Sequence, residues 1–358
     1  MALNKFGGGG ERLQRQNTHI GIAFLKMLMC FEVVCCHFWI CEKEYVPAIL
    51  VPIYILKDCA VPVFMTLSFY FYYKYLDKMN FSILLVRIKR LYIPQVAWAV
   101  IYWGVFMLME LVFHLERLHG LVPLFWQIVT GHSRELNPSM WYQFDLIVLT
   151  AIVSLLAIKL KGAKTLLVLF ALCMISVMMQ STGINVKIFG DMAYELKYPL
   201  GRLAEMIPYA FLGLAAFRYQ VLHRLKTHRY PVMLSAAGVM ILLAYLYWNG
   251  YVGQLKGFSY AGAFLFVMTI CLITIAYLFP NDSNCPEKIR RLSEKVTQYT
   301  LGIYCMHRLV GTIMKLAVSF LDLEINSFLL CIIVYALSYY VAYTVSKFFP
   351  VAMQRLVD

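Results

Sequence analysis

The chain has 358 residues, of which 61% are hydrophobic and 14% are charged, and its mean hydropathy is +0.70. This composition excludes an assembly of soluble domains and indicates a protein that is solvated by lipid. The formal net charge of +13 would suggest a nucleic-acid partner in a soluble protein. Here the basic residues lie in short segments between apolar runs, so membrane topology accounts for them and no nucleic-acid partner is expected.

A basic segment precedes the first apolar run. Lys5, Arg12 and Arg15 surround the glycine run 7–10. The segment has neither an apolar core nor a cleavage site of small residues, so no signal peptide is expected and the first helix is retained as an anchor. We predict that residues 1–18 form a cytoplasmic tail.

Apolar runs near twenty residues long recur along the whole chain. A helix of that length crosses a hydrocarbon core of about 30 Å at a rise of about 1.5 Å per residue. The runs mix aromatic and aliphatic residues without the alternation of a membrane barrel. We predict an all-α integral membrane protein with about ten transmembrane helices around a polar cavity, near residues 19–40, 58–77, 91–113, 140–158, 165–183, 201–219, 231–248, 258–279, 298–320 and 327–346.

The distribution of basic residues orients these predicted helices. With the N-terminus inside, the inner segments hold twenty-one lysines and arginines, the outer segments hold eight, and three lie within spans. Such an excess is typical of cytoplasmic loops. We predict that both termini are cytoplasmic, that residues 19–346 form one transmembrane domain in the plasma or inner membrane, and that residues 347–358 form a C-terminal tail.

Two predicted outer loops, 41–57 and 114–139, are longer than the others. Residues 121–129 of the second loop are apolar and aromatic, which suits a short amphipathic segment in the membrane interface. Cys41 and Cys59 flank the first loop and are candidates for a disulfide, whereas most other cysteines fall within apolar runs as small hydrophobic residues. The cysteines show no metal-like spacing, so no metal site is predicted.

The first predicted helix carries three ionisable residues, Lys26, Glu32 and His37. Each costs several kcal/mol in hydrocarbon unless it faces a partner or a wet cavity. At about 100° per residue, Lys26 and His37 lie on one stripe, about 16 Å apart along the axis. Glu32 lies off that stripe, where an ion pair with a neighbouring helix is favoured. His37 suits proton transfer to and from a hydroxyl, and a histidine satisfied at the interface is the alternative.

The next basic pair is Arg87 and Arg90, which lie one helical turn apart at the predicted inner mouth. Two guanidinium groups at this spacing suit the oxygens of a phosphate. A topological charge cluster beside anionic headgroups accounts for them equally well.

Further polar residues begin or interrupt later apolar runs. Asp58, Asp145 and Glu205 do so, and His307 lies beside Arg308 in the ninth predicted span. Each has a structural explanation when taken alone. Together, the density of polar residues within the spans favours an aqueous cavity that is open to a polar substrate.

Five short motifs resemble those of the membrane-bound acyltransferase-3 family. They occur in the family's order, and the resemblance extends over most of the chain. The first helix is similar to the family's basic residue, ten intervening positions and histidine, with Lys26 where arginine is commoner. Residues 61–68 resemble a Pro-x-Phe-x-x-x-Ser element, although Phe69 replaces the usual glycine. The other three elements are Arg-x-x-Arg at 87–90, a tryptophan element at 140–142, and Tyr-x-x-His at 304–307.

The resemblance implies an O-acyltransferase that moves an acetyl or other short acyl group from cytoplasmic acyl-CoA to a hydroxyl of an extracytoplasmic glycan or lipid-linked sugar. It implies that Arg87 and Arg90 bind the phosphates of the donor. In this hypothesis His37 is a general base or a transient acyl carrier, and Lys26 holds the charge of the donor or of the tetrahedral oxyanion. The expected cavity-lining residues are Ser68, Trp141, Asp145, Glu205, Tyr304, His307 and Arg308.

Acyl-CoA enters this hypothesis as a substrate, and no permanently bound cofactor is expected. Expected partners are a surface polysaccharide or lipid-linked saccharide, membrane lipids and the machinery of glycan synthesis or export. Two other interpretations of the buried polar residues remain open: a transporter that moves an anion or protons, and a subunit that exports or presents a polysaccharide.

Overall fold

The computed structural model describes residues 19–39, 46–113, 120–182, 192–250, 260, 262–279 and 286–348, and these residues form helices and turns without a β-strand. The predicted tail 1–18, most of the tail 347–358 and Cys41 lie outside this part of the chain. The α-helices are α1 (Ile20–Phe38), α2 (Val51–Leu56), α3 (Ala60–Tyr72), α4 (Phe81–Phe113), α5 (Leu121–Thr130), α6 (Trp141–Leu160), α7 (Gly162–Thr182), α9 (Tyr194–Arg218), α10 (Val221–Arg224), α11 (Arg229–Trp248), α12 (Ala263–Leu278), α13 (Glu287–Gln298), α14 (Thr300–Phe320) and α15 (Ser327–Phe348).

Each of the ten predicted spans overlaps one of these helices, which confirms an all-α fold with many apolar helices. Within the described ranges, nine helical segments are long and apolar enough to cross a membrane. The predicted span at 258–279 corresponds to α12, which has 16 residues and is shorter than each of these nine segments. The predicted interfacial segment at 121–129 is the ten-residue helix α5.

Two of the predicted boundaries differ from the structure by about ten residues. The loop predicted at 41–57 is helical from residue 48 onward, because η2 (Ala48–Leu50), α2 and η3 (Lys57–Cys59) continue directly into α3. The helix predicted at 91–113 begins at Phe81. The Asn80 side chain accepts a hydrogen bond from the Ile83 amide at 2.9 Å, which caps the helix ten residues earlier than the apolar run suggests.

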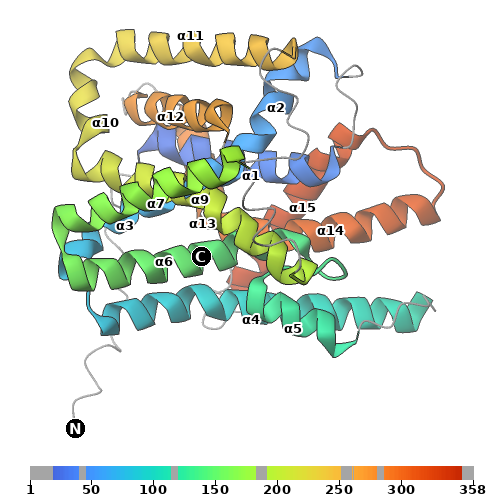
Figure 1. Cartoon of the computed structure of the whole chain (residues 1–358). Coiled ribbons are helices and arrows are strands. Elements are labelled where there is room, and N and C mark those ends of the chain that lie inside the picture. Colours follow the sequence, from blue (N-terminus) through green and yellow to red (C-terminus); the bar gives the residue numbers. More distant parts are fainter. Residues whose placement is uncertain are drawn as a thin grey trace.

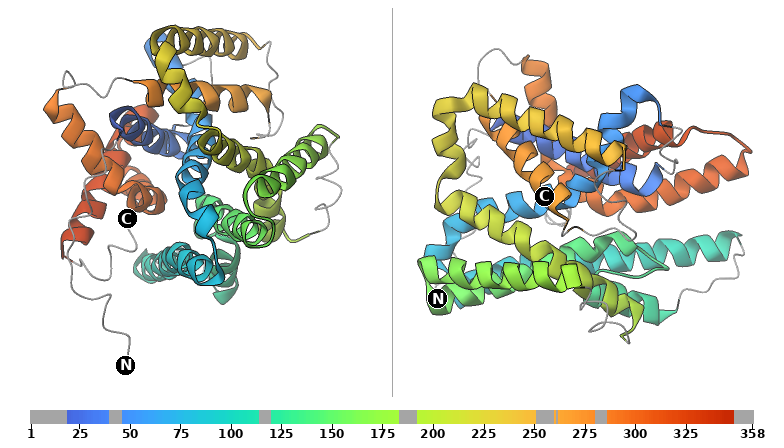
Figure 2. Two further views of the ribbon diagram at one scale, coloured as in Figure 1. Left: turned by 90° about the vertical axis from the view of Figure 1, so that its left-hand side faces the viewer. Right: turned by 45° about the horizontal axis from the view of Figure 1, so that its top comes forward.

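Helix α1 lies inside the bundle, in contact with α3, α12, α13, α14 and α15. Figure 2 (left) shows it in dark blue between the orange and red C-terminal helices on one side and α3 and α12 on the other. Gly21 permits its close approach to α12, because a Cβ there would collide with the carbonyl oxygen of Ala276. The ionisable residues of α1 are therefore held inside the protein.

Helix α11 runs along one edge of the bundle in Figure 1, beside α12. None of its residues is buried, and large apolar side chains such as Leu234 and Ile241 are 76% and 71% exposed. Apolar surface of this kind is unfavourable in water and suits contact with lipid chains. The outer helices thus have the surface of a multi-pass membrane protein.

Candidate active site

The side chains of His37 and Ser139 are in contact. His37 lies in the last turn of α1, and Ser139 lies in the short helix η5 (Pro138–Met140) that leads into α6. The His37 Nε2 atom is 3.1 Å from the Ser139 Oγ atom, which is a hydrogen-bonding distance. Ser139 is buried and His37 is half-buried. A hydroxyl can therefore reach the imidazole nitrogen at the distance that general-base catalysis requires.

A second imidazole, that of His307 on α14, lies beside His37. The two ring centroids are 5.2 Å apart. His307 is fully buried, and its Nδ1 atom is 2.6 Å from the carbonyl oxygen of Tyr304. Because a carbonyl can only accept, Nδ1 carries the proton and Nε2 keeps a lone pair. Within the described residues that Nε2 atom has no hydrogen-bond partner.

Close packing of α1 on α14 brings the two histidines together. Gly311 lies one turn after His307 and faces the ring of Phe38, the neighbour of His37. A Cβ at position 311 would collide with that ring. The absence of a side chain at Gly311 thus sets the distance between the end of α1 and the middle of α14.

Tyrosine hydroxyls connect η5 and α3 to the histidines. The Tyr304 hydroxyl donates a hydrogen bond to the Ser139 carbonyl oxygen. The ring of Tyr142 packs edge-on against Tyr304 with centroids 5.7 Å apart, and the Tyr142 hydroxyl is hydrogen-bonded to Ser68. Ser68, Tyr304 and His307, which were predicted to line one cavity, are therefore neighbours in the structure.

The segment from 131 to 139 presents Ser139 to His37. Gly131 ends α5 in the left-handed conformation (φ 65°), where its amide donates to the Gln127 carbonyl at 3.1 Å. The Gln127 side chain then donates to the Gly131 carbonyl and accepts from the Asn137 amide. The Asn137 side chain accepts in turn from the Ser139 amide at 2.9 Å. Side chains thus satisfy the backbone of this buried loop.

His132 anchors the same loop. Its Nδ1 atom donates to the Pro138 carbonyl oxygen at 2.9 Å, and its ring stacks on Tyr198 with centroids 4.5 Å apart. Burial lowers the pKa of His132, while the hydrogen bond to Pro138 and the charge of Glu195 partly oppose that shift. The imidazole is accordingly neutral at pH 7.

Three other predicted residues surround Arg202 on α9. Arg202 Nη1 is 2.7 Å from Glu205 Oε2, which also accepts from the Tyr260 amide at 3.0 Å. The Arg202 guanidinium lies 5.9 Å from the Trp141 ring centroid. Asp145 is fully buried, electrostatically coupled to Arg202 and Glu205, and neither of its carboxylate oxygens has a hydrogen-bond partner in the described part of the chain.

The remaining predicted residues lie elsewhere. The Lys26 ammonium is 5.3 Å from the Phe71 ring centroid, and the Arg87 guanidinium is 4.1 Å from that of Tyr72. Arg87 is half-buried and Arg90 is exposed. Arg308, which is half-buried, acts electrostatically on both His37 and His307. Of the predicted site cations, Arg308 is therefore the one that acts on the imidazoles.

Glu32 is separate from this centre. It is fully buried, and the ion pair predicted for it is absent from the described residues, where neither carboxylate oxygen has a hydrogen-bond partner. Asp58 and Lys57 act on it electrostatically. Glu32 therefore interacts electrostatically with residues of η3 and not with the two histidines.

The site residues predicted from the sequence did not include Ser139, His132 or Arg202. A signal for Ser139 was present, because Asn137-Pro138 directly before a helix is a typical capping sequence. The spacing of Arg202 and Glu205 is that of an ion pair on one helix face. His132 offered no such signal, because the aromatic rings that it contacts, those of Tyr194 and Tyr198, come from a distant part of the chain.

Comparison with known proteins assigns the chain to one family. The model of the acyltransferase-3 family, which is described as an acyltransferase domain, matches residues 19–347. No curated protein and no solved structure matches the chain. The matched range contains the whole histidine centre, which consists of His37, Ser139, Tyr304 and His307.

Proposed function

This chain belongs to the acyltransferase-3 family, and from that premise we propose that it moves an acetyl or other short acyl group from cytoplasmic acyl-CoA to a hydroxyl of an extracytoplasmic cell-surface glycan or lipid-linked sugar. The observation that carries this proposal is the approach of a hydroxyl oxygen, Ser139 Oγ, to within 3.1 Å of His37 Nε2. An acceptor hydroxyl that displaced Ser139 would meet the imidazole with the same geometry.

In the proposed reaction His37 takes the proton of the acceptor hydroxyl, whose oxygen attacks the carbonyl carbon of the thioester. The tetrahedral intermediate collapses as its C–S bond breaks, and the departing sulfur of coenzyme A takes the proton from His37. Arg308 acts electrostatically on both imidazoles, and we assign its charge to the stabilisation of the developing oxyanion. Transient acylation of His37 remains the second route to the same products.

The donor would extend from the arginine pair toward His37. Arg87 and Arg90 bind its phosphates, and Lys26 holds part of its negative charge along the way. Eleven residues of α1 separate Lys26 from His37, which is about 16 Å along the axis. The long, thin pantetheine arm of coenzyme A suits that separation, so we assign Lys26 to the donor and Arg308 to the oxyanion.

Purified protein and [¹⁴C]acetyl-CoA test this proposal, with O-deacetylated envelope glycan from cells that lack this protein as the acceptor. We expect release of coenzyme A in step with labelling of the glycan. His37→Ala should lower kcat by about 10²- to 10⁴-fold. The control is His228→Ala, because His228 is exposed and distant in the chain from the site. Absence of transfer from any acyl-CoA would reject the proposal in favour of transport or export, and turnover that survives His37→Ala would reject the role of His37.

A further inference from the structure

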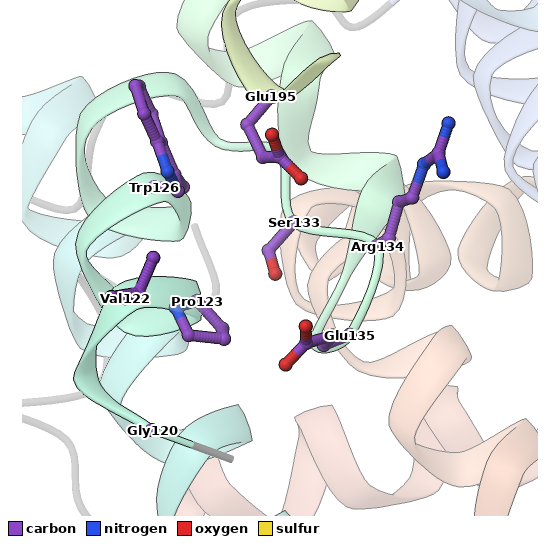
Figure 3. A pocket seen from close by; sticks show the side chains of 8 residues that line it. All are labelled: Gly120, Val122, Pro123, Trp126, Ser133, Arg134, Glu135 and Glu195. Atoms are coloured by element: carbon purple, nitrogen blue, oxygen red, sulfur yellow. The ribbon is translucent and has the colours of Figure 1, made fainter. Parts of the chain in front are cut away.

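A pocket of about 330 Å³ opens between α5, the loop that follows it and the first turn of α9. None of the residues that the sequence predicted as cavity-lining contributes to it. Its lining residues are Gly120, Val122, Pro123, Trp126, Ser133, Arg134, Glu135 and Glu195. Figure 3 shows these side chains around a common space.

The two sides of the pocket differ in chemistry. Trp126 and Pro123 form an apolar side on α5, and in Figure 3 the carboxylates of Glu195 and Glu135 and the hydroxyl of Ser133 face them. Arg134 also lines the pocket, but its guanidinium lies 3.4 Å from the ring centroid of Tyr194 and in Figure 3 is directed away from the other labelled side chains. The interior of the pocket is therefore acidic on one side and aromatic on the other.

This combination selects a class of ligand. The Glu195 carboxylate repels phosphates and other anions, and it accepts hydrogen bonds from hydroxyl groups. The electron-rich face of an indole attracts the weakly positive C–H groups of an uncharged ring. We infer that the pocket binds a neutral saccharide unit of the acceptor, an inference that rests on the acyl transfer proposed above.

The loop that lines the pocket also leads to the histidine centre. Ser133 lines the pocket, and Ser139, six residues later, contacts His37. Six residues span at most about 20 Å, so the two positions lie within reach of one oligosaccharide. His132 joins them, since its ring stacks on Tyr198 of α9 and its Nδ1 atom bonds Pro138. A sugar held in the pocket would thus place a neighbouring unit of the same glycan toward His37.

Kinetics with the O-deacetylated glycan and acetyl-CoA test the inference. Glu195→Gln and Trp126→Ala should each raise the KM for the glycan by about 10- to 100-fold, the size expected for the loss of a charge-assisted hydrogen bond or a stacked ring. The KM for acetyl-CoA should stay within about 3-fold of wild type, because the donor enters from the other end of α1. Val129→Ala is the control, since the exposed Val129 lies on α5 but does not line the pocket.

The outcomes separate the two proposals. Unchanged glycan KM in both variants, with transfer abolished by His37→Ala, would overturn the pocket and leave the acyl transfer standing. An equal rise of both KM values would also overturn it, because the pocket would then be only structural. Absence of transfer in the wild type would overturn both proposals. Glu195→Gln is nearly isosteric, so it keeps the test valid if Trp126→Ala fails to fold.

Discussion

The Tyr304 hydroxyl donates a hydrogen bond to the carbonyl oxygen of Ser139. This bond connects α14 to the residue whose hydroxyl contacts His37. Because Tyr304 also contributes its own carbonyl to His307, one residue orients both sides of the histidine centre. Replacing its hydroxyl should therefore disturb catalysis more than donor binding.

Tyr304→Phe removes only this hydroxyl. It leaves the buried Ser139 carbonyl without that donor, which costs about 1–3 kcal/mol. We expect kcat for glycan acylation to fall about 10-fold or more while the KM for acetyl-CoA is unchanged, as steady-state kinetics would show. Tyr299→Phe is the control, because Tyr299 also lies near α14 and its ring packs on Tyr339 and Tyr343. Equal effects of the two variants would contradict the positioning role.

Gly311→Ala should separate α1 from α14. A Cβ at this position collides with the Phe38 ring, and overpacking of this kind costs about 1–3 kcal/mol. Gly104→Ala on α4 is the matched control, because nothing lies within 4 Å of its added Cβ and the exchange should stabilise the helix by up to about 1 kcal/mol. In detergent, Gly311→Ala should lower the midpoint of thermal unfolding and Gly104→Ala should raise it.

Long apolar runs made the helices predictable, because a lipid environment permits few alternatives to a helix. Contacts between helices that are distant in the sequence were less predictable. His37 and His307 were both predicted as site residues, but nothing in their local sequence indicates that their rings lie 5.2 Å apart. That distance depends on Gly311, which a sequence pattern shows only as a glycine inside an apolar run.

Periodicity also left the role of Lys26 incompletely specified. A common stripe fixes which face a residue occupies, yet two residues on one stripe can lie at different depths in the membrane. The structure places Lys26 against Phe71 and puts Arg308 near His37. Ser139 was missed for a related reason, because its importance comes from where η5 lies beside α1.

Arg87→Ala distinguishes donor binding from a topological charge. If Arg87 binds a phosphate of acyl-CoA, its loss should raise the KM for acetyl-CoA by about 10- to 100-fold, as expected for a charge-assisted hydrogen bond. Lys89→Ala carries the same change in charge at an exposed position two residues away and should have little effect. Similar small changes in both variants would instead support a charge cluster beside lipid headgroups. Initial rates over a range of acetyl-CoA concentrations measure this difference.

His132 should make the protein less stable in acid. Burial is the largest cause of its lowered pKa, and the charges of Arg134 and Arg202 act in the same direction. Between this lowered pKa and the ordinary value near 6.5, the unfolded chain binds more protons at His132 than the folded protein does. The free energy of unfolding therefore rises with pH in that window, so the contribution of His132 is present above pH 6.5 and is lost as the pH falls.

The measurement is the thermal unfolding midpoint in detergent at pH 7.5 and pH 5.5, for the wild type and for His132→Gln. Glutamine does not titrate, so the variant should lose less stability on acidification than the wild type does. His228→Gln should retain the full wild-type difference, because His228 is exposed in the folded protein. An identical acid shift in the wild type and in His132→Gln would show that other groups cause it. Since His132 also holds the loop of Ser139, we expect acidification to lower kcat at a higher pH than the pH at which it weakens the binding of acetyl-CoA.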